Sequence, residues 1–293
     1  MSDLSGFLVI DKPAGITSHD VVAQVRRALN TKKVGHAGTL DPMATGVLVL
    51  GIGNGTRLLQ YITEGKKAYL ATIYLGAATT TDDKDGEQIS KASVEQIGSS
   101  QIQIELAKFV GKIMQRPSSV SAIKIDGKPA HERVRAGEVV EIKPREVEVF
   151  DLQIQSIEKK DDFYLVKILV TCSAGTYIRA IARDLGDQLK CGGHLVELRR
   201  TLVAPFDISQ AKQLDAIDET QITNTTQAVT KLFSTRSLSF EEVAEIKFGR
   251  FIDASDGESF FAALDNQGEF VALLQNKLVG SNKKAAPILV VNN

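Results

Sequence analysis

The chain has few cysteines, no long apolar run and almost no net charge, and each shortage excludes a class of protein. Its 293 residues include two cysteines, Cys172 and Cys191, too few for a disulfide framework and without the spacing of zinc ligands. They indicate free thiols in a reducing cytosol, so we expect a cytoplasmic protein. No apolar run is long enough to span a membrane, and no basic stretch followed by an apolar one indicates a signal peptide.

The net charge of −1 argues against a nucleic-acid partner, because such proteins are usually basic. The distribution of charge weakens this argument. Residues 1–200 carry 27 basic and 24 acidic side chains, whereas residues 201–293 carry 8 and 12. Residues 112–145 alone hold 8 basic and 4 acidic side chains and are rich in loop formers. We therefore predict a basic arm over 112–145 that contacts RNA phosphates.

Several cofactor and metal motifs are absent or incomplete. The glycines of 51–55 follow a predicted strand, but the third glycine comes too early for a dinucleotide fingerprint, and no acidic ribose partner follows. The acidic loop 81–86 fails as a calcium loop, because two ligand positions lack a carboxylate, and we interpret it as a solvated turn. Ser18 and His19 are neighbours without a placed acid and form no triad. The sequence predicts neither a metal nor a cofactor.

The candidate for a reactive group lies within residues 35–57. Asp41 precedes Pro42 in a glycine-rich turn, and the apolar run from Val47 to Leu50 predicts a buried strand. A carboxylate on a stiff loop at the end of a sheet can act as a nucleophile, and nothing else in the chain looks like one. The alternative is a purely structural Asp-Pro turn.

Strand and helix patterns alternate along the first two-thirds of the chain. They predict strands at 7–10, 68–76 and 163–172. They also predict three helices: one that begins at Thr17 or Ser18, one over 101–114, and one that begins at Thr176. From about residue 235 the composition changes to short apolar runs separated by Gly, Asn and Asp. That pattern predicts a small β-rich domain over 235–293.

Five motifs occur in a fixed order along this part of the chain. They are DKPAGITS from Asp11, GHAGTLDP from Gly35, KKAY from Lys66, CSAGTYIR from Cys172 and GHLVELRR from Gly193. In sequence and order these segments resemble the signature of the bacterial tRNA pseudouridine-55 synthase family. Motifs in the right order are a stronger signal than any single one.

The resemblance implies an α+β fold with a mixed, largely antiparallel central sheet. It implies a catalytic domain over 1–234 and a small PUA-like RNA-binding domain over 235–293. The implied reaction converts uridine 55 in the T loop of tRNA to pseudouridine, and the uridine must first be flipped out of its stack. Because the reaction changes no redox state, it needs no cofactor. The implied partner is the T arm of tRNA, with no obligate protein partner and no membrane.

By resemblance, the catalytic residues are Asp41, its guanidinium partner Arg179, and Tyr69, which packs on the flipped uracil. The carboxylate attacks the sugar or the base, or stabilises charge while a proton leaves the ribose. In each role it must be ionised and shielded from water, and a nearby guanidinium lowers its pKa. Seen alone, Tyr69 would be assigned to the core and Arg179 to a surface salt bridge.

The resemblance also implies four residues that bind the substrate or support the pocket. Tyr177, two residues before Arg179, reaches the pocket from a strand-to-helix junction, and Leu198 closes over the uracil. His36 enters the T loop beside the extruded base, and Lys12 supports the pocket. Without the resemblance, Leu198 would be a core residue, His36 a structural histidine and Lys12 a solvated lysine.

Three other functions remain open from the sequence. The first is a guide-RNA-dependent pseudouridine synthase subunit, which shares the Asp41 loop. The second is a non-catalytic tRNA chaperone that only remodels the T arm. The third is a hydrolase that uses an aspartate nucleophile on small molecules and has no need of a basic arm.

Overall fold

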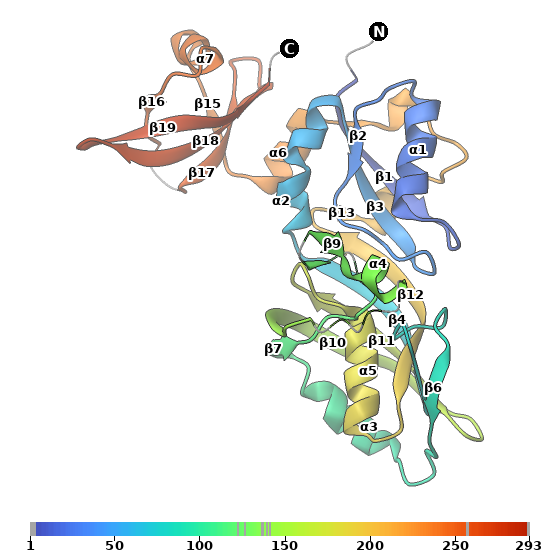
Figure 1. Ribbon diagram of the computed structural model, residues 1–293. Coiled ribbons are helices and arrows are strands. Elements are labelled where there is room, and N and C mark those ends of the chain that lie inside the picture. The colour runs from blue at the N-terminus through green and yellow to red at the C-terminus, as the bar shows by residue number, and fades with distance from the viewer. Residues whose placement is uncertain are drawn as a thin grey trace.

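The computed structural model describes residues 4–291 except 122, 126, 136, 137, 139, 141, 256 and 257. A ten-stranded sheet is its largest element. The strands are β1 (Gly6–Lys12), β2 (Val34–His36), β3 (Thr45–Ile52), β4 (Lys67–Leu75), β7 (Gly111–Gln115), β10 (Arg145–Lys159), β11 (Tyr164–Cys172), β12 (Gly193–Val203), β13 (Phe206–Asp207) and β14 (Thr223–Asn224). Their order is β14-β1-β3-β12-β4-β11-β10-β7, with β2 beside β3 and β13 beside β12 (Figure 1).

One strand pair differs from the others in this sheet. Within the described part of this sheet, β3 and β12 pair in parallel, with Arg199 opposite Thr45 and Arg200 opposite Gly46, whereas all other paired strands are antiparallel. Gly46 has a φ of 101°, and a Cβ there would lie 2.2 Å from the carbonyl oxygen of Arg200. Only glycine fits this approach. The prediction of a mixed, largely antiparallel sheet in an α+β fold is confirmed.

Seven helices accompany the strands in the described chain. They are α1 (Ser18–Ala28), α2 (Leu59–Thr63), α3 (Ser99–Ala107), α4 (Ala130–Arg135), α5 (Ile178–Gln188), α6 (Thr225–Leu232) and α7 (Phe240–Lys247). None of them is long and apolar enough to cross a membrane.

Helix α1 begins where the sequence predicts. Thr17 Oγ1 accepts a hydrogen bond from the backbone N–H of Asp20 at 3.1 Å, and Asp20 Oδ2 accepts one from the N–H of Thr17 at 2.8 Å. This reciprocal capping box satisfies two donors that the first turn leaves free. Val21, Val25 and Leu29 are buried against β1 and β3, so α1 covers one face of this half of the sheet.

Two local predictions are wrong. The helix expected over 101–114 ends at Ala107, because Gly111, with a φ of 96°, starts strand β7, which pairs with β10. Val110, expected on the apolar face, is 47% exposed. Thr176 does not cap α5: its hydroxyl donates to the carbonyl of Ser173 at 3.0 Å, and the N-cap residue is Tyr177.

The C-terminal part of the chain forms a second sheet, as predicted. Its five strands are β15 (Thr235–Ser237), β16 (Ile252–Asp253), β17 (Phe260–Leu264), β18 (Phe270–Val279) and β19 (Asn282–Val290). The two sheets share a hydrophobic core, in which Phe7 and Val49 belong to the same buried cluster as Leu273 and Leu289. In Figure 1 this sheet lies beside the β1–β3 half of the large one.

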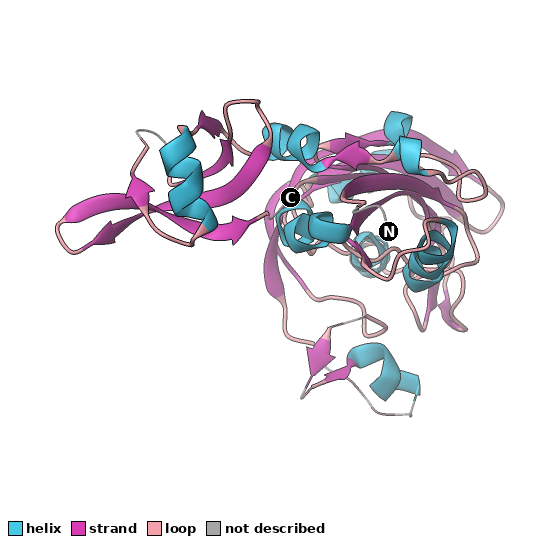
Figure 2. Cartoon of the chain, turned by 90° about the horizontal axis from the view of Figure 1, so that it is seen from above, coloured by secondary structure: helices cyan, strands magenta, loops and turns pink. Residues whose placement is uncertain are grey.

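Two small hairpins lie outside these two sheets. One is formed by β5 (Ala77–Thr79) and β6 (Gln88–Lys91), the other by β8 (Lys124–Ile125) and β9 (Lys128–Pro129). Figure 2 shows β8, β9 and α4 projecting from the body of the molecule, within the arm expected over 112–145. The first residues of that arm belong to β7, and residues 122, 126, 136, 137, 139 and 141 lie outside the described residues.

Candidate active site

A cavity of about 300 Å³ opens where β4 and β12 meet the loop before β3 and the start of α5. The loop that carries Asp41 forms one wall, and the N-terminus of α5 forms another. Five of the seven predicted site residues line it: Asp41, Tyr69, Tyr177, Arg179 and Leu198. The fold therefore brings together residues that lie up to 157 positions apart in the sequence, from Asp41 to Leu198.

The loop of Asp41 is fixed on both sides of the carboxylate. Before it, the Ser18 hydroxyl accepts from the N–H of Leu40 at 2.9 Å and donates to the carbonyl of Leu40 at 3.2 Å. After it, the carbonyl of Pro42 accepts from the N–H of Gly15 at 2.8 Å and from Lys12 Nζ at 3.3 Å. The start of α1 and the end of β1 thus hold Asp41 in place.

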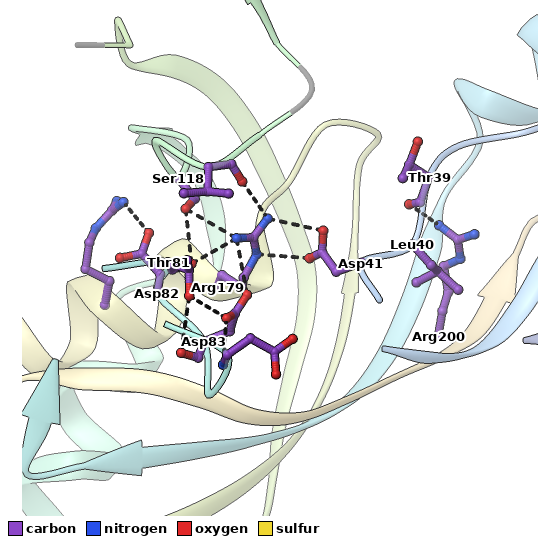
Figure 3. A network of polar contacts seen from close by, with 12 residues as sticks. Thr39, Leu40, Asp41, Thr81, Asp82, Asp83, Ser118, Arg179 and Arg200 are labelled. Atoms are coloured by element: carbon purple, nitrogen blue, oxygen red, sulfur yellow. Dashed lines mark hydrogen bonds and ion pairs between the residues drawn. The ribbon is translucent and has the colours of Figure 1, made fainter. Parts of the chain in front are cut away.

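Arg179 holds the Asp41 carboxylate through two parallel contacts, Nε to Oδ2 at 3.0 Å and Nη2 to Oδ1 at 3.2 Å (Figure 3). Arg179 also donates to the carbonyls of Thr81 at 2.9 Å and Val120 at 3.0 Å. Its side chain is 6% exposed and that of Asp41 is 33% exposed. The surface salt bridge considered for Arg179 is therefore wrong, and the pair has the geometry that fixes a carboxylate most firmly.

The acidic loop 81–86 is not a solvated turn, which corrects our interpretation of the sequence. Asp83 is buried, and its Oδ2 lies 3.3 Å from Nη1 of Arg179; Asp82 Oδ2 lies 3.1 Å from Nη1 of Arg183 (Figure 3). The sequence held a signal for this contact. Arg179 and Arg183 are four residues apart, so they share one face of α5 and need a partner of opposite charge.

Burial controls the ionisation of this site. It raises the pKa of Asp41 above its ordinary value; Asp83 adds to this effect, and Arg179 and Lys12 oppose it. As predicted, the guanidinium of Arg179 lowers the pKa of Asp41, but burial raises this pKa by more. Burial also lowers the pKa values of Lys12 and Lys67 to about 8.

Strands β4 and β12 supply the floor of the cavity. Their register places Arg200 opposite Tyr69 and Leu198 opposite Ala71, so these side chains share one face. Tyr69 and Leu198 are 8% and 7% exposed, as expected if each were a core residue. Both nevertheless line the cavity. Burial raises the pKa of the Tyr69 hydroxyl, which therefore stays protonated at neutral pH.

Arg200 is a site residue that the sequence did not reveal. It is 1% exposed, and its guanidinium donates to three carbonyls, those of Val47 at 2.7 Å, Gly38 at 3.1 Å and Thr39 at 3.3 Å. Two of these, Gly38 and Thr39, belong to the loop just before Asp41, and Figure 3 shows the contact to Thr39. Arg200 thus braces that loop from β12.

Tyr177 is held by the start of the arm. The side-chain amide of Gln115 accepts from the N–H of Tyr177 at 2.8 Å and donates to its carbonyl at 3.0 Å. The guanidinium of Arg145 lies 5.4 Å from the centre of the Tyr177 ring and donates to the carbonyl of Gly175 at 2.6 Å. Both ends of the expected arm therefore contact the segment that carries Tyr177, at the predicted strand-to-helix junction.

His36 and Lys12 do not line the cavity. Lys12 is 0% exposed, and its Nζ donates to the carbonyls of Pro13 and Ile16 at 2.9 and 2.8 Å and to that of Pro42, so it is not a solvated lysine. His36 lies on β2, with its ring 5.3 Å from that of His19. Burial lowers the pKa of His36, and its Nδ1 has no hydrogen-bond partner in the described structure. The described residues contain no group of three or more His, Cys, Asp or Glu side chains arranged to hold a metal ion.

Comparison with protein families places this geometry in a known group. The model described as "TruB family pseudouridylate synthase (N terminal domain)" matches residues 26–178, more than half of the chain. The chain belongs to the TruB family. A second model, "tRNA pseudouridylate synthase B C-terminal domain", matches residues 179–237. The predicted family, and with it the prediction of a pseudouridine synthase, is confirmed.

Curated TruB relatives resemble the chain over nearly its whole length. The tRNA pseudouridine synthase B of Corynebacterium diphtheriae is 46% identical over 291 residues, which cover 98% of this chain and 96% of the relative. That of Nocardia farcinica is 46% identical over 290 residues, covering 98% and 94%. Among solved structures, the Cbf5-Nop10-Gar1 complex contains a chain with a TM-score of 0.71 and 25% identity, covering 98% of this chain and 84% of that one.

Proposed function

We propose that this TruB-family chain converts uridine 55 in the T loop of tRNA to pseudouridine, with Asp41 as the catalytic carboxylate. One observation carries the proposal: two bonds from a buried guanidinium hold the Asp41 carboxylate at the wall of a cavity that also contains a buried tyrosine. The 46% identity to bacterial enzymes named tRNA pseudouridine synthase B supports tRNA as the substrate.

The reaction rearranges the uridine without adding or removing atoms. The bond between N1 of uracil and C1′ of ribose breaks, the ring turns, and C5 bonds to C1′. C5 then loses its proton to solvent, and N1 takes one up. The target base must leave its stack to bring this bond to Asp41, and a cavity that excludes water protects the detached ring.

Each predicted residue has a part in this proposal. Asp41, ionised and oriented by Arg179, acts at the glycosidic bond. Tyr69 packs against the ring of the flipped uracil, and its protonated hydroxyl is available to donate or relay a proton. Leu198 covers the ring and, with Tyr177, completes the wall of the cavity.

The remaining residues position the RNA and the loop. His36 contacts the T loop, Lys12 supports the Asp41 loop from below, and the basic arm over 112–145 contacts the backbone. We propose residues 1–234 as the catalytic unit and 235–293 as a PUA-like RNA-binding unit. No obligate protein partner is required, and because tRNA is a cytoplasmic molecule, the reaction takes place in the cytoplasm.

The variant Asp41→Asn tests the proposal, because it keeps the shape of the side chain and removes its charge. We expect loss of pseudouridine formation, measured as tritium release from tRNA labelled at C5 of uridine, with nearly unchanged tRNA binding. Appreciable product from this variant would contradict the catalytic role. Mass mapping of tRNA after incubation with the wild-type chain should locate the product at position 55 and at no other position.

The same assays separate the alternatives. A guide-RNA-dependent subunit would leave transcribed tRNA unmodified when supplied alone, and a chaperone would bind tRNA but release no tritium. A hydrolase of small molecules would be indifferent to RNA. The structural likeness to Cbf5 supports the shared fold, whereas the bacterial tRNA enzymes have the higher identity, 46% against 25%.

A further inference from the structure

A second hollow, of about 800 Å³, lies at the C-terminal end of α1. It is formed by segments far apart in the sequence: residues 4–5, 26–33, 53–54 and Glu219. Its basic lining consists of Arg26, Arg27, Lys32 and Lys33. Glu219 is the single acidic side chain among the described lining residues, so the hollow carries an excess of positive charge.

The backbone of this hollow is fixed rather than loose. Arg26 Nη2 donates to the carbonyl of Val34 at 2.8 Å, which ties the end of α1 to β2. The N–H of Gly53 donates to the carbonyl of Lys33 at 2.9 Å, and the N–H of Thr31 donates to that of Arg26 at 3.1 Å. The backbone of segment 26–33 is therefore already ordered, so little backbone entropy is lost when a ligand binds to the side chains that it carries.

The four cations lack acidic partners. None of them forms an ion pair with a described residue, whereas Lys91, Lys108 and Lys112 each pair with a carboxylate. Like charges that converge on one concavity repel one another and raise its potential. An anion with several charges relieves this repulsion, so the chemistry of the hollow favours phosphate groups.

The hollow stands at a defined distance from the catalytic loop. Helix α1 has 11 residues, so its ends are about 16 Å apart. Ser18, at its first turn, bonds to Leu40 beside Asp41, whereas Arg26 and Arg27 lie in its last turn. Along β2, Lys33 is three residues from His36, roughly 10 Å in an extended strand. The hollow is too far away to touch a base bound at Asp41, but near enough to contact the same RNA molecule.

We propose that this basic hollow binds backbone phosphates of the tRNA whose uridine occupies the Asp41 cavity, at nucleotides away from the flipped base. The inference rests on the proposed function, because it takes tRNA as the ligand. No aromatic side chain occurs among the described residues of the lining, so a nucleobase has nothing to stack on there. Contacts to phosphates strengthen binding and fix its register without reading sequence.

The test compares two double variants in the full-length chain. Lys32→Ala/Lys33→Ala removes two exposed cations from the hollow. Lys167→Ala/Lys190→Ala removes two exposed cations, on β11 and just after α5, that likewise form no ion pair with a described residue. The Kd for transcribed tRNA is measured by filter binding over a series of salt concentrations, and kcat by tritium release at saturating tRNA.

We expect the hollow variant to raise the Kd about tenfold and to lower the slope of log Kd against log salt by about 2, while the control leaves both unchanged. Its kcat should equal that of the wild type, because neither lysine contacts the cavity. A Kd and slope equal to those of the wild type would overturn the inference, as would equal losses in both double variants.

Failure of the proposed function would instead appear as a wild-type chain that forms no pseudouridine, an outcome that leaves the binding comparison valid. Lys32→Glu/Lys33→Glu, which reverses both charges, should weaken binding further than the alanine pair.

Discussion

The Asp41 carboxylate is surrounded by more positive than negative side chains. Arg179, Lys12 and Arg200 lower its pKa, and Asp83 raises it, in addition to burial. Lys12 and Arg200 satisfy their own donors with backbone carbonyls rather than with carboxylates of the described residues. Positive charge in this cavity stabilises any anionic state of the detached uracil, which supports the proposed chemistry.

The pH dependence of the reaction follows from these neighbours. Because the proposed mechanism needs ionised Asp41 and burial raises its pKa, kcat/KM should fall with decreasing pH at a higher pH than for an ordinary aspartate. Asp83→Asn removes a negative neighbour and should move this acid limb to lower pH, whereas Lys12→Met removes a positive one and should move it to higher pH. Tritium release at sub-saturating tRNA, measured across the acidic pH range, gives kcat/KM and so the pH at which it falls. An identical limb in all three proteins would contradict this account.

The neighbours of Asp41 also mark a limit of sequence reasoning. Asp41 stood out because its motif is local, with Pro42 and glycines beside it. The role of Asp83 depends on Arg179, which lies 96 positions along the chain; the spacing of Arg179 and Arg183 indicates that an acidic partner is needed but not which residue it is. Arg200 could not be found either, because an arginine whose partners are backbone carbonyls leaves no complementary charge in the sequence.

At the scale of elements, β12 carries two adjacent arginines, of which Arg200 contacts the Asp41 loop and Arg199 contacts β1. Arg200 reaches the carbonyls of Gly38 and Thr39, and Arg199, on the other face, pairs with Asp11 at 2.7 Å. The first is buried and the second is 38% exposed in its side chain. Substituting each arginine in turn therefore compares a buried contact to the Asp41 loop, made by Arg200, with a partly exposed ion pair, made by Arg199.

We expect Arg200→Met to lower kcat about 100-fold with little change in the KM for tRNA, because it frees the loop that carries Asp41. It removes the donor from the buried carbonyl of Val47 and from the partly buried carbonyls of Gly38 and Thr39, and should lower the free energy of unfolding by about 3 kcal/mol. Arg199→Met should cost about 1 kcal/mol or less and leave kcat unchanged. Steady-state kinetics and urea unfolding measure both quantities. Equal kcat losses in the two variants would exclude a positioning role for Arg200.

Element boundaries were predictable where the signal was local. A capping residue at Thr17 or Ser18 indicated the start of α1, and the apolar runs indicated β1, β3, β4 and β11. Prediction failed where pairing between distant strands overrode local periodicity. Residues 111–114 continued a helical pattern, but they pair with β10, which begins at Arg145. A helical period cannot report a strand partner that lies outside its window.

At the scale of the whole molecule, the two sheets are joined by a common core. Leu273 lies in the cluster that contains Phe7 and Val49, whereas the adjacent Leu274 lies in a cluster confined to the C-terminal part of the chain. Both leucines are 0% exposed. Because neighbouring residues of a strand point to opposite faces, the two positions report on different cores.

Leu273→Ala and Leu274→Ala should each lower the free energy of unfolding by about 2–5 kcal/mol. They should differ in where the structure loosens. We expect Leu273→Ala to speed amide hydrogen exchange in β1 and β3 as well as in β18, and Leu274→Ala to speed it only in the C-terminal sheet. Hydrogen exchange read by mass spectrometry distinguishes them, and the same exchange pattern in both variants would argue against a shared core.

The parallel pairing of β3 with β12 also affects how the enzyme is made. Val47 and Arg200, which are bonded across this seam, are separated by 153 positions, so synthesis at ~5–20 residues per second leaves β3 waiting roughly 8–30 s for its partner. The wait concerns only the first residues of β3, Thr45 and Gly46, because β1 pairs along its whole length and β2 pairs with residues 50–52. A nascent chain therefore carries the Asp41 loop well before Arg200 emerges to hold the carbonyls of Gly38 and Thr39 in place.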